Sequence, residues 1–311
     1  MNKRKLISII VPVYNEENGL IAFHGQLKKV IDALDYDFEI VFVNDGSIDG
    51  SLEVLVSLHK NDKRMKIMNL SRNFGQQNAL TAGIDQAKGD AVILMDVDLE
   101  DRPEYIASFV DYWNKGYQVV YARRGKRKVS VLRKICFGLF HRANRIISSV
   151  DMDAAGAFCL MDQVVVKQMQ KLTERDKYIP GLRSWIGFKQ MGIETVRGSR
   201  YDNMPRVKFS SLFKLAFDSF TSFSTLPLKT AIFFGILFSA LSFVGVVSVI
   251  ILKLVFKLAI LGWASTISVI LLLGGIQLIC MGLQGEYIAR IFNEVKNRPA
   301  YIIKEKIGFE E

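Results

Sequence analysis

The sequence predicts an α/β protein with a doubly wound, mostly parallel sheet, followed by interfacial amphipathic helices and a C-terminal two-helix transmembrane hairpin. Over the first half of the 311 residues, short apolar runs alternate with segments of helical period, a pattern typical of repeated strand–helix units. Over the last third, two long runs contain no charged residue, although 23% of the chain is charged. Charged and apolar residues are therefore segregated along the chain, and the two regions predict different architectures.

The expected strands and helices alternate at short intervals. We expect strands at residues 6–13, 38–43, 66–70, 91–95 and 119–122. We expect helices at residues 17–34, 51–60 and 76–87, and a further helix that begins at Pro103. Ligands of such sheets bind beyond the carboxyl ends of the strands. The polar residues that directly follow each strand are therefore the candidate site residues.

The two uncharged runs are each long enough to cross a bilayer as a helix. They cover about residues 230–252 and 258–285, and roughly 20 apolar helical residues span a hydrocarbon core. Lysine and arginine are more frequent before and after this pair of runs than between them. The positive-inside rule then places both termini in the cytoplasm. The sequence predicts a multi-pass protein of the cytoplasmic (inner) membrane.

Positive charge is concentrated in one segment. Residues 112–150 contain ten lysine or arginine residues and no aspartate or glutamate, in a chain of net charge +10. Such a field favours an anionic partner. Residues 130–150 have the pattern of a basic amphipathic helix, which either lines a groove or lies on an anionic membrane surface, and we favour the membrane. The segment lacks the interleaved aromatic residues of a single-strand binder, so no nucleic-acid partner is expected.

Acidic residues follow three of the expected strands. Glu16 follows the first strand, Asp45 the second, and Asp96 and Asp98 the fourth. A carboxylate pair spaced i, i+2 suits a divalent cation bridged to phosphate oxygens, because hard cations take oxygen ligands and keep room for a substrate. Ordinary surface turns are the alternative, but acidic residues at three strand ends favour a site. No Gly-x-Gly-x-x-Gly follows the first strand, so a dinucleotide site is not supported.

Several segments resemble a known family. Three of them look like the nucleotide-sugar motifs of the family-two glycosyltransferases, which have the GT-A fold: Val11–Glu16, Val43–Ser47 and Asp96–Glu100. Three more are similar to the polyprenol-phosphate sugar transferases, a branch with dolichol-phosphate mannose synthases and bactoprenol (undecaprenyl-phosphate) glucosyltransferases: Arg72–Leu80, Ser184–Phe188 and Gly262–Ser265. The chain has no Gln-x-x-Arg-Trp string, which argues against the processive polysaccharide synthases.

The resemblance implies a metal-dependent hexosyltransferase that moves a sugar, with glucose from UDP-glucose as the expectation, onto undecaprenyl or another polyprenyl phosphate. The expected product is β-linked. The implied donor nucleotide-binding residues are Pro12, Tyr14, Glu16, Asp45 and Asp96. The implied ligands of Mg²⁺ or Mn²⁺ are Asp98, Asp96 and Glu100. The implied catalytic residues are Asp96, Asp98 and Asp153, and the implied ligands of the lipid phosphate are Arg123, Arg133 and Lys208.

The chain departs from the family pattern at two places. Gly156–Leu160 stands where relatives commonly have Gly-Asp-Phe-Arg-Leu, and Asp153 is the upstream substitute for the missing aspartate. Asn203–Lys208 replaces a Gly-x-Ser-Lys acceptor loop. Two alternatives stay open: a transferase that uses an N-acetylhexosamine, mannose or modified arabinose donor, and an inactive membrane scaffold that keeps the fold.

The expected domain organisation has four parts. Residues 1–204 form a cytoplasmic GT-A glycosyltransferase domain, and residues 205–228 form interfacial amphipathic helices. Residues 229–285 form the two-helix transmembrane region, and residues 286–311 a cytoplasmic tail. The expected partners are a nucleotide sugar, a polyprenyl phosphate lipid and the membrane. Small residues in the first uncharged run would permit close helix approach in a homo-oligomer: Gly235, Ser239 and Ser242.

Overall fold

The computed structural model of the chain describes residues 4–124, 156–175, 177–196 and 262–309, together with separate positions between 231 and 251. The chain divides into two compact units. The first unit joins Met1–Phe209 to the C-terminal Pro299–Glu311, and the second is Ser210–Arg298. The C-terminal residues therefore belong with the N-terminal unit, although nearly ninety residues separate them in the sequence.

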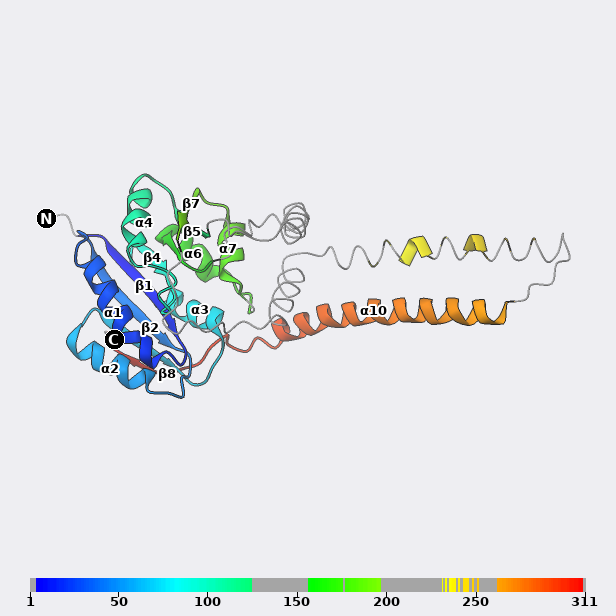
Figure 1. The fold of residues 1–311 in the computed structure, drawn as a ribbon, viewed down its shortest axis with the longest axis horizontal. Coiled ribbons are helices and arrows are strands. Elements are labelled where there is room, and N and C mark those ends of the chain that lie inside the picture. The colour runs from blue at the N-terminus through cyan, green and yellow to red at the C-terminus, as the bar shows by residue number, and fades with distance from the viewer. Residues whose placement is uncertain are drawn as a thin grey trace. The chain divides into compact units, whose positions relative to one another are not determined.

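The elements of the first unit follow the expected alternation through its first five strands (Figure 1). In chain order they are β1 (Leu6–Val13), α1 (Glu17–Ile31), β2 (Asp37–Asn44), α2 (Ser51–Asn61), β3 (Met65–Leu70), α3 (Gln76–Gln86), β4 (Ala91–Leu94), α4 (Tyr105–Asn114) and β5 (Val119–Arg124). They continue with β6 (Cys159–Asp162), α6 (Gln163–Lys171), α7 (Ile179–Ile186), β7 (Gln190–Thr195) and β8 (Ile303–Ile307). The second unit contains α10 (Trp263–Val295).

The eight strands that the structure describes form one sheet, in the order β7-β5-β6-β4-β1-β2-β3-β8. Strands β4, β1, β2 and β3 are parallel to one another, and β5 is parallel to β7. Strand β6 runs antiparallel to both of its neighbours, and β8 runs antiparallel to β3. The sheet is therefore mostly parallel, as predicted, with β6 and β8 as its two described antiparallel strands. The apolar pattern predicts strands, but it does not predict the direction in which a strand returns after a long intervening segment.

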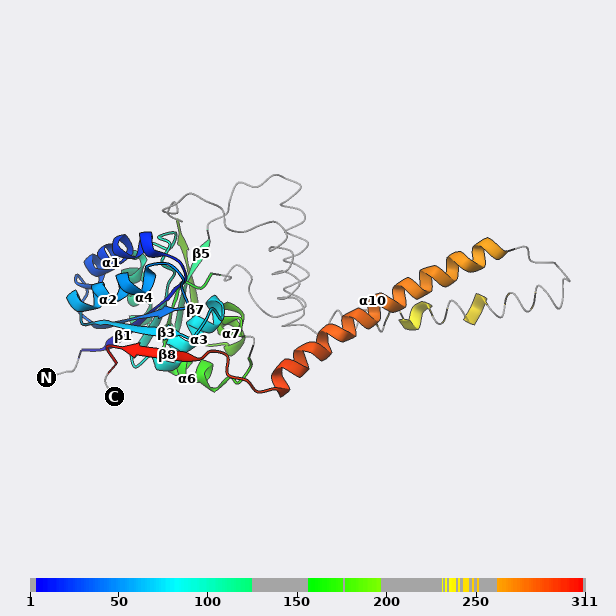
Figure 2. The ribbon, with the colours of Figure 1, turned by 90° about the horizontal axis from the view of Figure 1, so that it is seen from below.

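Helices cover both faces of the sheet, as a doubly wound architecture requires (Figure 2). Helices α1, α2 and α4 lie on one face, and α3, α6 and α7 lie on the other. The central strands are accordingly buried on both sides. In β1, for example, Ile7, Ile9 and Ile10 are all fully buried. This burial explains why the central strands are continuous apolar runs rather than alternating ones.

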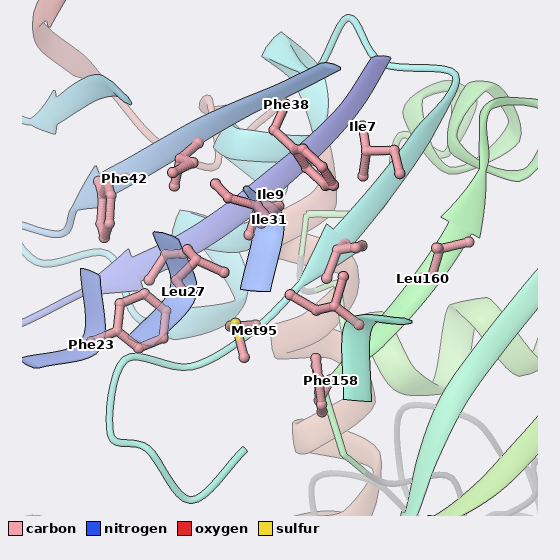
Figure 3. Close-up of a cluster of buried hydrophobic side chains, with 14 of the residues drawn as sticks. Ile7, Ile9, Phe23, Leu27, Ile31, Phe38, Phe42, Met95, Phe158 and Leu160 are labelled. Atoms are coloured by element: carbon pink, nitrogen blue, oxygen red, sulfur yellow. The ribbon is translucent and has the colours of Figure 1, made fainter. Parts of the chain in front are cut away.

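The larger part of the core lies beneath α1 and α4 (Figure 3). Phe23, Leu27 and Ile31 of α1 belong to the same buried cluster as Ile9 and Phe42. The rings of Phe23 and Phe42 meet edge to face at 6.3 Å between centroids, a preferred arrangement for aromatic pairs. Each fully buried side chain of this size contributes roughly 1.5–3 kcal/mol by leaving water. This core fixes the central strands on which the candidate site is built.

Helix α10 does not support the predicted transmembrane hairpin. It begins at Trp263 rather than Leu258 and continues beyond Gly285 to Val295, through an ion pair of 3.2 Å between Arg290 and Glu286. Part of the first uncharged run, residues 230–252, lies outside the described residues. Within the described part of the chain, no helix is both long enough and apolar enough to cross a membrane. The predicted hairpin and the predicted multi-pass localisation are therefore wrong.

Residues 286–311, expected as a tail, instead contain the end of α10 and the edge strand β8. Strand β8 pairs with β3, from Ile67 opposite Ile307 to Leu70 opposite Ile303. Its sequence, IKEKI, places charged side chains on an exposed sheet edge, as natural edge strands commonly do. The predicted interfacial helices at 205–228 and the predicted basic helix at 130–150 lie outside the described residues.

Gly83 provides a test of how tightly α3 packs on the sheet. A Cβ atom at this position would overlap Cγ2 of Ile10, which is fully buried and has no space in which to move. We expect Gly83→Ala to lower the free energy of unfolding by about 1–3 kcal/mol, measured by urea denaturation. Gly25→Ala is the matched control, because Gly25 is an exposed position of α1 with open space around it. We expect it to raise stability by up to about 1 kcal/mol, and equal effects of the two variants would contradict the described packing.

Candidate functional site

The carboxyl ends of β1, β2, β3 and β4 meet at one edge of the sheet. Val13 lies opposite Asn44, and Asn44 lies opposite Asn69. Leu94 ends β4 beside Ile10 of β1. The buried amide of Asn44 donates to Oδ1 of Asn69 at 2.9 Å, which ties the ends of β2 and β3 together. Polar residues that are distant in the sequence are thereby brought to one place.

The loops after β1 and β2 are joined by hydrogen bonds through Asn15. Its backbone N–H donates to Oγ of Ser47 at 3.0 Å, and its Oδ1 accepts from the N–H of Ile48 at 2.9 Å. Asn15 has a positive φ of 54°, a conformation that asparagine tolerates better than most residues. The next N–H, of Glu16, donates to Oγ of Ser51 at 3.0 Å. These bonds hold the two loops as one rigid wall.

Asp45 joins the end of β2 to the loop after β3. We call residues 71–75 the donor loop. The buried carboxylate of Asp45 accepts from the N–H groups of Phe74 at 2.7 Å and Gly75 at 2.9 Å. Burial raises the pKa of Asp45, although these two hydrogen bonds and the nearby Arg72 oppose the change. Each carboxylate oxygen keeps acceptor capacity beyond the bond that it makes to the loop.

The donor loop also packs closely on the turn after Asp45. Gly46 has a φ of 64°, and a Cβ there would overlap the backbone of Arg72 and lie 2.6 Å from the nitrogen of Asn73. Only glycine adopts this conformation without strain and permits the close approach. The loop's position is therefore determined by backbone contacts and by the Asp45 carboxylate together.

Asp96 and Asp98 follow the end of β4. Oδ1 of Asp96 accepts from the side-chain amide of Gln76 at 2.7 Å. Oδ1 of Asp98 accepts from the N–H of Glu100 at 3.0 Å. Leu99, between Asp98 and Glu100, has a φ of 59°, a left-handed conformation that costs energy in a leucine. This local strain and the two hydrogen bonds orient the carboxylate pair.

These strand ends enclose a cavity of about 240 Å³. The lining residues are Pro12, Val13, Tyr14, Glu16, Asp45, Asn73, Gly75, Gln76, Asp96, Val97 and Asp98. Tyr14 is 43% exposed, so its ring is accessible to a planar ligand. The cavity thus combines an aromatic ring, backbone groups and three aspartates, which suits a ligand with a planar base and a phosphate chain.

The carboxylate pair fits a divalent cation only if the substrate and water supply the remaining ligands. Among the described residues, no cluster of three or more histidine, cysteine, aspartate or glutamate residues could hold a metal ion by itself. Mg²⁺ is commonly bound by one or two carboxylates together with phosphates of the substrate and water. Asp96 and Asp98 offer that type of donor set at the wall of the cavity.

The structure brings together only part of the predicted site. All five predicted donor-binding residues line the cavity, and so does Asp98. Glu100 and Arg123 are described but do not line it, and Arg123 lies exposed on β5 opposite Glu194 of β7. Three predicted residues lie outside the described residues: Arg133, Asp153 and Lys208. The roles assigned to all of these residues stay predictions.

Asn73, Gly75 and Gln76 line the cavity but are absent from the predicted set. All three follow β3, so the same strand-end reasoning applies to them. They were missed because the strand-end reasoning favoured acidic residues, and the family resemblance assigned no role to residues of this segment. Gln76 in particular contacts the candidate metal ligand Asp96.

The chain is similar to several known proteins. The model of the family described as glycosyl transferase family 2 matches residues 8–169. The uncharacterized glycosyltransferase YkcC of Bacillus subtilis (strain 168) is 42% identical over 312 residues, covering 100% of this chain and 97% of that protein. The bactoprenol glucosyl transferase of Shigella phage SfII is 38% identical, with 96% and 97% covered. A solved glucosyl-3-phosphoglycerate synthase from Mycobacterium tuberculosis, in complex with Mn²⁺, UDP and phosphoglyceric acid, aligns with a TM-score of 0.49 at 16% identity, covering 68% and 75%.

The raised pKa of Asp45 predicts a measurable titration. Because burial raises the pKa of Asp45 above its ordinary value of 3.8 in the folded chain, the folded chain binds this proton more tightly than the unfolded chain does. The stability from this group is full below the unfolded pKa and is lost as pH rises through the folded pKa. We expect the ¹³C-carboxyl resonance of Asp45, assigned by its absence in Asp45→Asn, to titrate with a midpoint above 3.8. A midpoint at or below 3.8 would contradict the effect of burial.

Proposed function

The chain belongs to glycosyl transferase family 2, and we propose that it transfers glucose from UDP-glucose to undecaprenyl phosphate or another polyprenyl phosphate. The observation that carries this proposal is the cavity at which Tyr14, Asp45, Asp96 and Asp98 converge. Support for the sugar and the lipid comes from relatives that carry the name bactoprenol glucosyl transferase and align along nearly the whole chain. The proposed product is a β-linked polyprenyl-phosphate glucose.

The nucleoside occupies the part of the cavity between Tyr14 and Asp45 in this proposal. The exposed ring of Tyr14 offers a stacking surface for a base. The Asp45 carboxylate accepts hydrogen bonds from N–H or O–H groups of the base or ribose. Its connection to the donor loop makes the backbone of Asn73 and Gly75 part of the same binding surface.

The diphosphate lies toward Asp96 and Asp98. Mg²⁺ or Mn²⁺, when bound there, supplies positive charge that offsets the negative charge on the leaving nucleoside diphosphate. Asp98 is the proposed direct ligand. Gln76 holds Asp96 through its side-chain amide, and the N–H of Glu100 holds Asp98. These contacts orient both carboxylates before the donor arrives, which is the arrangement that electrostatic catalysis requires.

The acceptor phosphate does not need a strong general base. A phosphate monoester has a second pKa of about 6, so at neutral pH it is largely a dianion and a competent nucleophile. The site must instead hold it in line behind the anomeric carbon, and arginine and lysine are suited to that task. We propose Arg123, Arg133 and Lys208 for this role, with Asp153 in place of the family aspartate. In-line displacement inverts the anomeric carbon and converts an α-linked donor into a β-linked product.

A donor panel tests the proposed substrates. Purified protein in detergent, with undecaprenyl phosphate and Mn²⁺, is incubated with labelled UDP-glucose, UDP-N-acetylglucosamine, GDP-mannose and a UDP-linked modified arabinose. We expect label to enter the lipid fraction from UDP-glucose at a rate at least tenfold above the others, and the product to carry a β-linkage by NMR. Preferred transfer from another donor would replace glucose in the proposal, and transfer from none of them would reject the polyprenyl-phosphate acceptor.

Asp98→Ala tests the carboxylate pair. We expect transfer to fall by at least about 100-fold, because the metal's charge stabilisation is worth several kcal/mol and each 1.36 kcal/mol is a factor of ten. The melting temperature should stay within a few degrees, since Asp98 is only half-buried. Asp111→Ala, at an exposed position of α4, is the control and should transfer normally. Near-normal turnover by Asp98→Ala that still requires metal would remove Asp98 from the mechanism.

A further inference from the structure

The C-terminal segment that follows α10 contacts the element that carries the donor loop. We call residues Tyr301–Lys306 the C-terminal clamp. The clamp belongs to the first unit, and its strand β8 lies along β3 (Figure 2). Strand β3 leads directly into the donor loop, and the loop leads directly into α3. The clamp is therefore placed beside the structures that form one wall of the cavity.

Backbone pairing between the clamp and β3 continues past the end of the strand. Leu70, the last residue of β3, lies opposite Ile303 after an irregularity in the register. The N–H of Ser71, the first residue of the donor loop, then donates to the carbonyl oxygen of Ile302 at 2.9 Å. The clamp thus fixes the point at which the donor loop leaves the sheet.

Side chains of the clamp hold the far end of α3. The hydroxyl of Tyr301 donates to Oδ2 of Asp85 at 2.9 Å, and Nζ of Lys306 donates to Oε1 of Gln86 at 2.7 Å. Asp85 and Gln86 are the last two residues of α3. Burial and the neighbouring carboxylate of Asp85 raise the pKa of the Tyr301 hydroxyl. Tyr301 therefore stays protonated and remains a hydrogen-bond donor at every working pH.

The opposite end of the loop–helix unit is held by the site itself. Asp45 binds the N–H groups of Phe74 and Gly75, and the side chain of Gln76 binds Asp96. A rigid helix held at one end by the clamp and at the other by two candidate site carboxylates has little freedom to shift. Loss of the clamp contacts would let α3 and the donor loop move relative to Asp45 and Asp96.

We propose that the C-terminal clamp positions the donor loop and α3 for nucleotide binding, with Tyr301 as the principal positioning residue. This inference rests on the proposed function for the identity of the nucleotide. Tyr301 itself does not line the cavity, so it acts through Asp85 and α3 rather than by contact with substrate. The link from Val295, the last residue of α10, to Tyr301 is short, so α10 is joined covalently to this positioning device through residues 296–300.

Tyr301→Phe removes one hydroxyl and leaves the ring. Loss of a single hydrogen bond changes an equilibrium by about 2- to 12-fold. We expect hydrogen exchange of the amides of residues 71–78, measured by mass spectrometry or NMR without ligand, to accelerate about threefold to tenfold. We expect the KM for UDP-glucose to rise by a similar factor, with kcat and the KM for undecaprenyl phosphate within twofold of the original values.

Tyr36→Phe is the matched control. The Tyr36 hydroxyl also donates to a side chain, Oδ1 of Asn114 at 3.1 Å. Tyr36 directly precedes β2, so it lies at the amino ends of the parallel strands, whereas the donor loop lies at their carboxyl ends. Asp85→Ala should reproduce Tyr301→Phe, and the double variant should add little, because both changes remove the same contact. Asp85→Asn keeps an acceptor oxygen and should restore most of the lost protection and most of the donor KM.

Two outcomes would overturn the inference. In one, exchange at residues 71–78 is the same in Tyr301→Phe as in Tyr36→Phe. In the other, the KM for UDP-glucose stays unchanged in Tyr301→Phe while the original protein transfers glucose. Absence of transfer by the original protein, together with faster exchange confined to Tyr301→Phe and Asp85→Ala, would reject the proposed function and support the positioning role.

Discussion

The carboxylate of Asp45 determines how the candidate site is assembled. It lies at the end of β2, is almost fully buried, and binds two successive N–H groups of the donor loop. Burial of a carboxylate is unfavourable unless hydrogen bonds compensate for the lost water. The N–H groups of the donor loop supply those hydrogen bonds. The loop also packs so closely on Gly46 that a side chain at position 46 would overlap its backbone. The contact between Asp45 and the donor loop therefore fixes the ends of β2 and β3 relative to each other.

The same arrangement explains why the site depends on residues far from it in the sequence. Gln76, directly after the donor loop, reaches Asp96 beyond β4, so the second and fourth strand ends are connected through α3. The far end of α3 is held by Tyr301 and Lys306 of the C-terminal segment. The cavity wall is therefore a continuous chain of contacts from β8 through α3 to the carboxylate pair. A transferase that works by placing charges requires rigidity of this kind, because its interactions must be in place before the reaction begins.

Local patterns in the sequence predict the central strands and the strand ends well. Asp45, Asp96 and Asp98 directly follow buried apolar runs, and the structure brings them to one cavity. Contacts that depend on distant pairing were not predictable in this way. Strand β6 is a short run that ends in an aspartate, and β8 is mostly charged, so neither shows a clear strand pattern. The transmembrane hairpin was predicted from two uncharged runs, but no helix of the described residues is long and apolar enough to be a span. The roles of Arg133, Asp153 and Lys208 stay predictions from resemblance.

A crystal structure with UDP and Mn²⁺ tests the central claim most directly, namely that the strand-end cavity holds the nucleotide. We predict density for the base and ribose beside Tyr14 and Asp45, and for the diphosphate beside Asp96 and Asp98, with the metal ion between the phosphates and Asp98. Density for UDP at another place, with this cavity filled only by water at saturating UDP, would contradict the account.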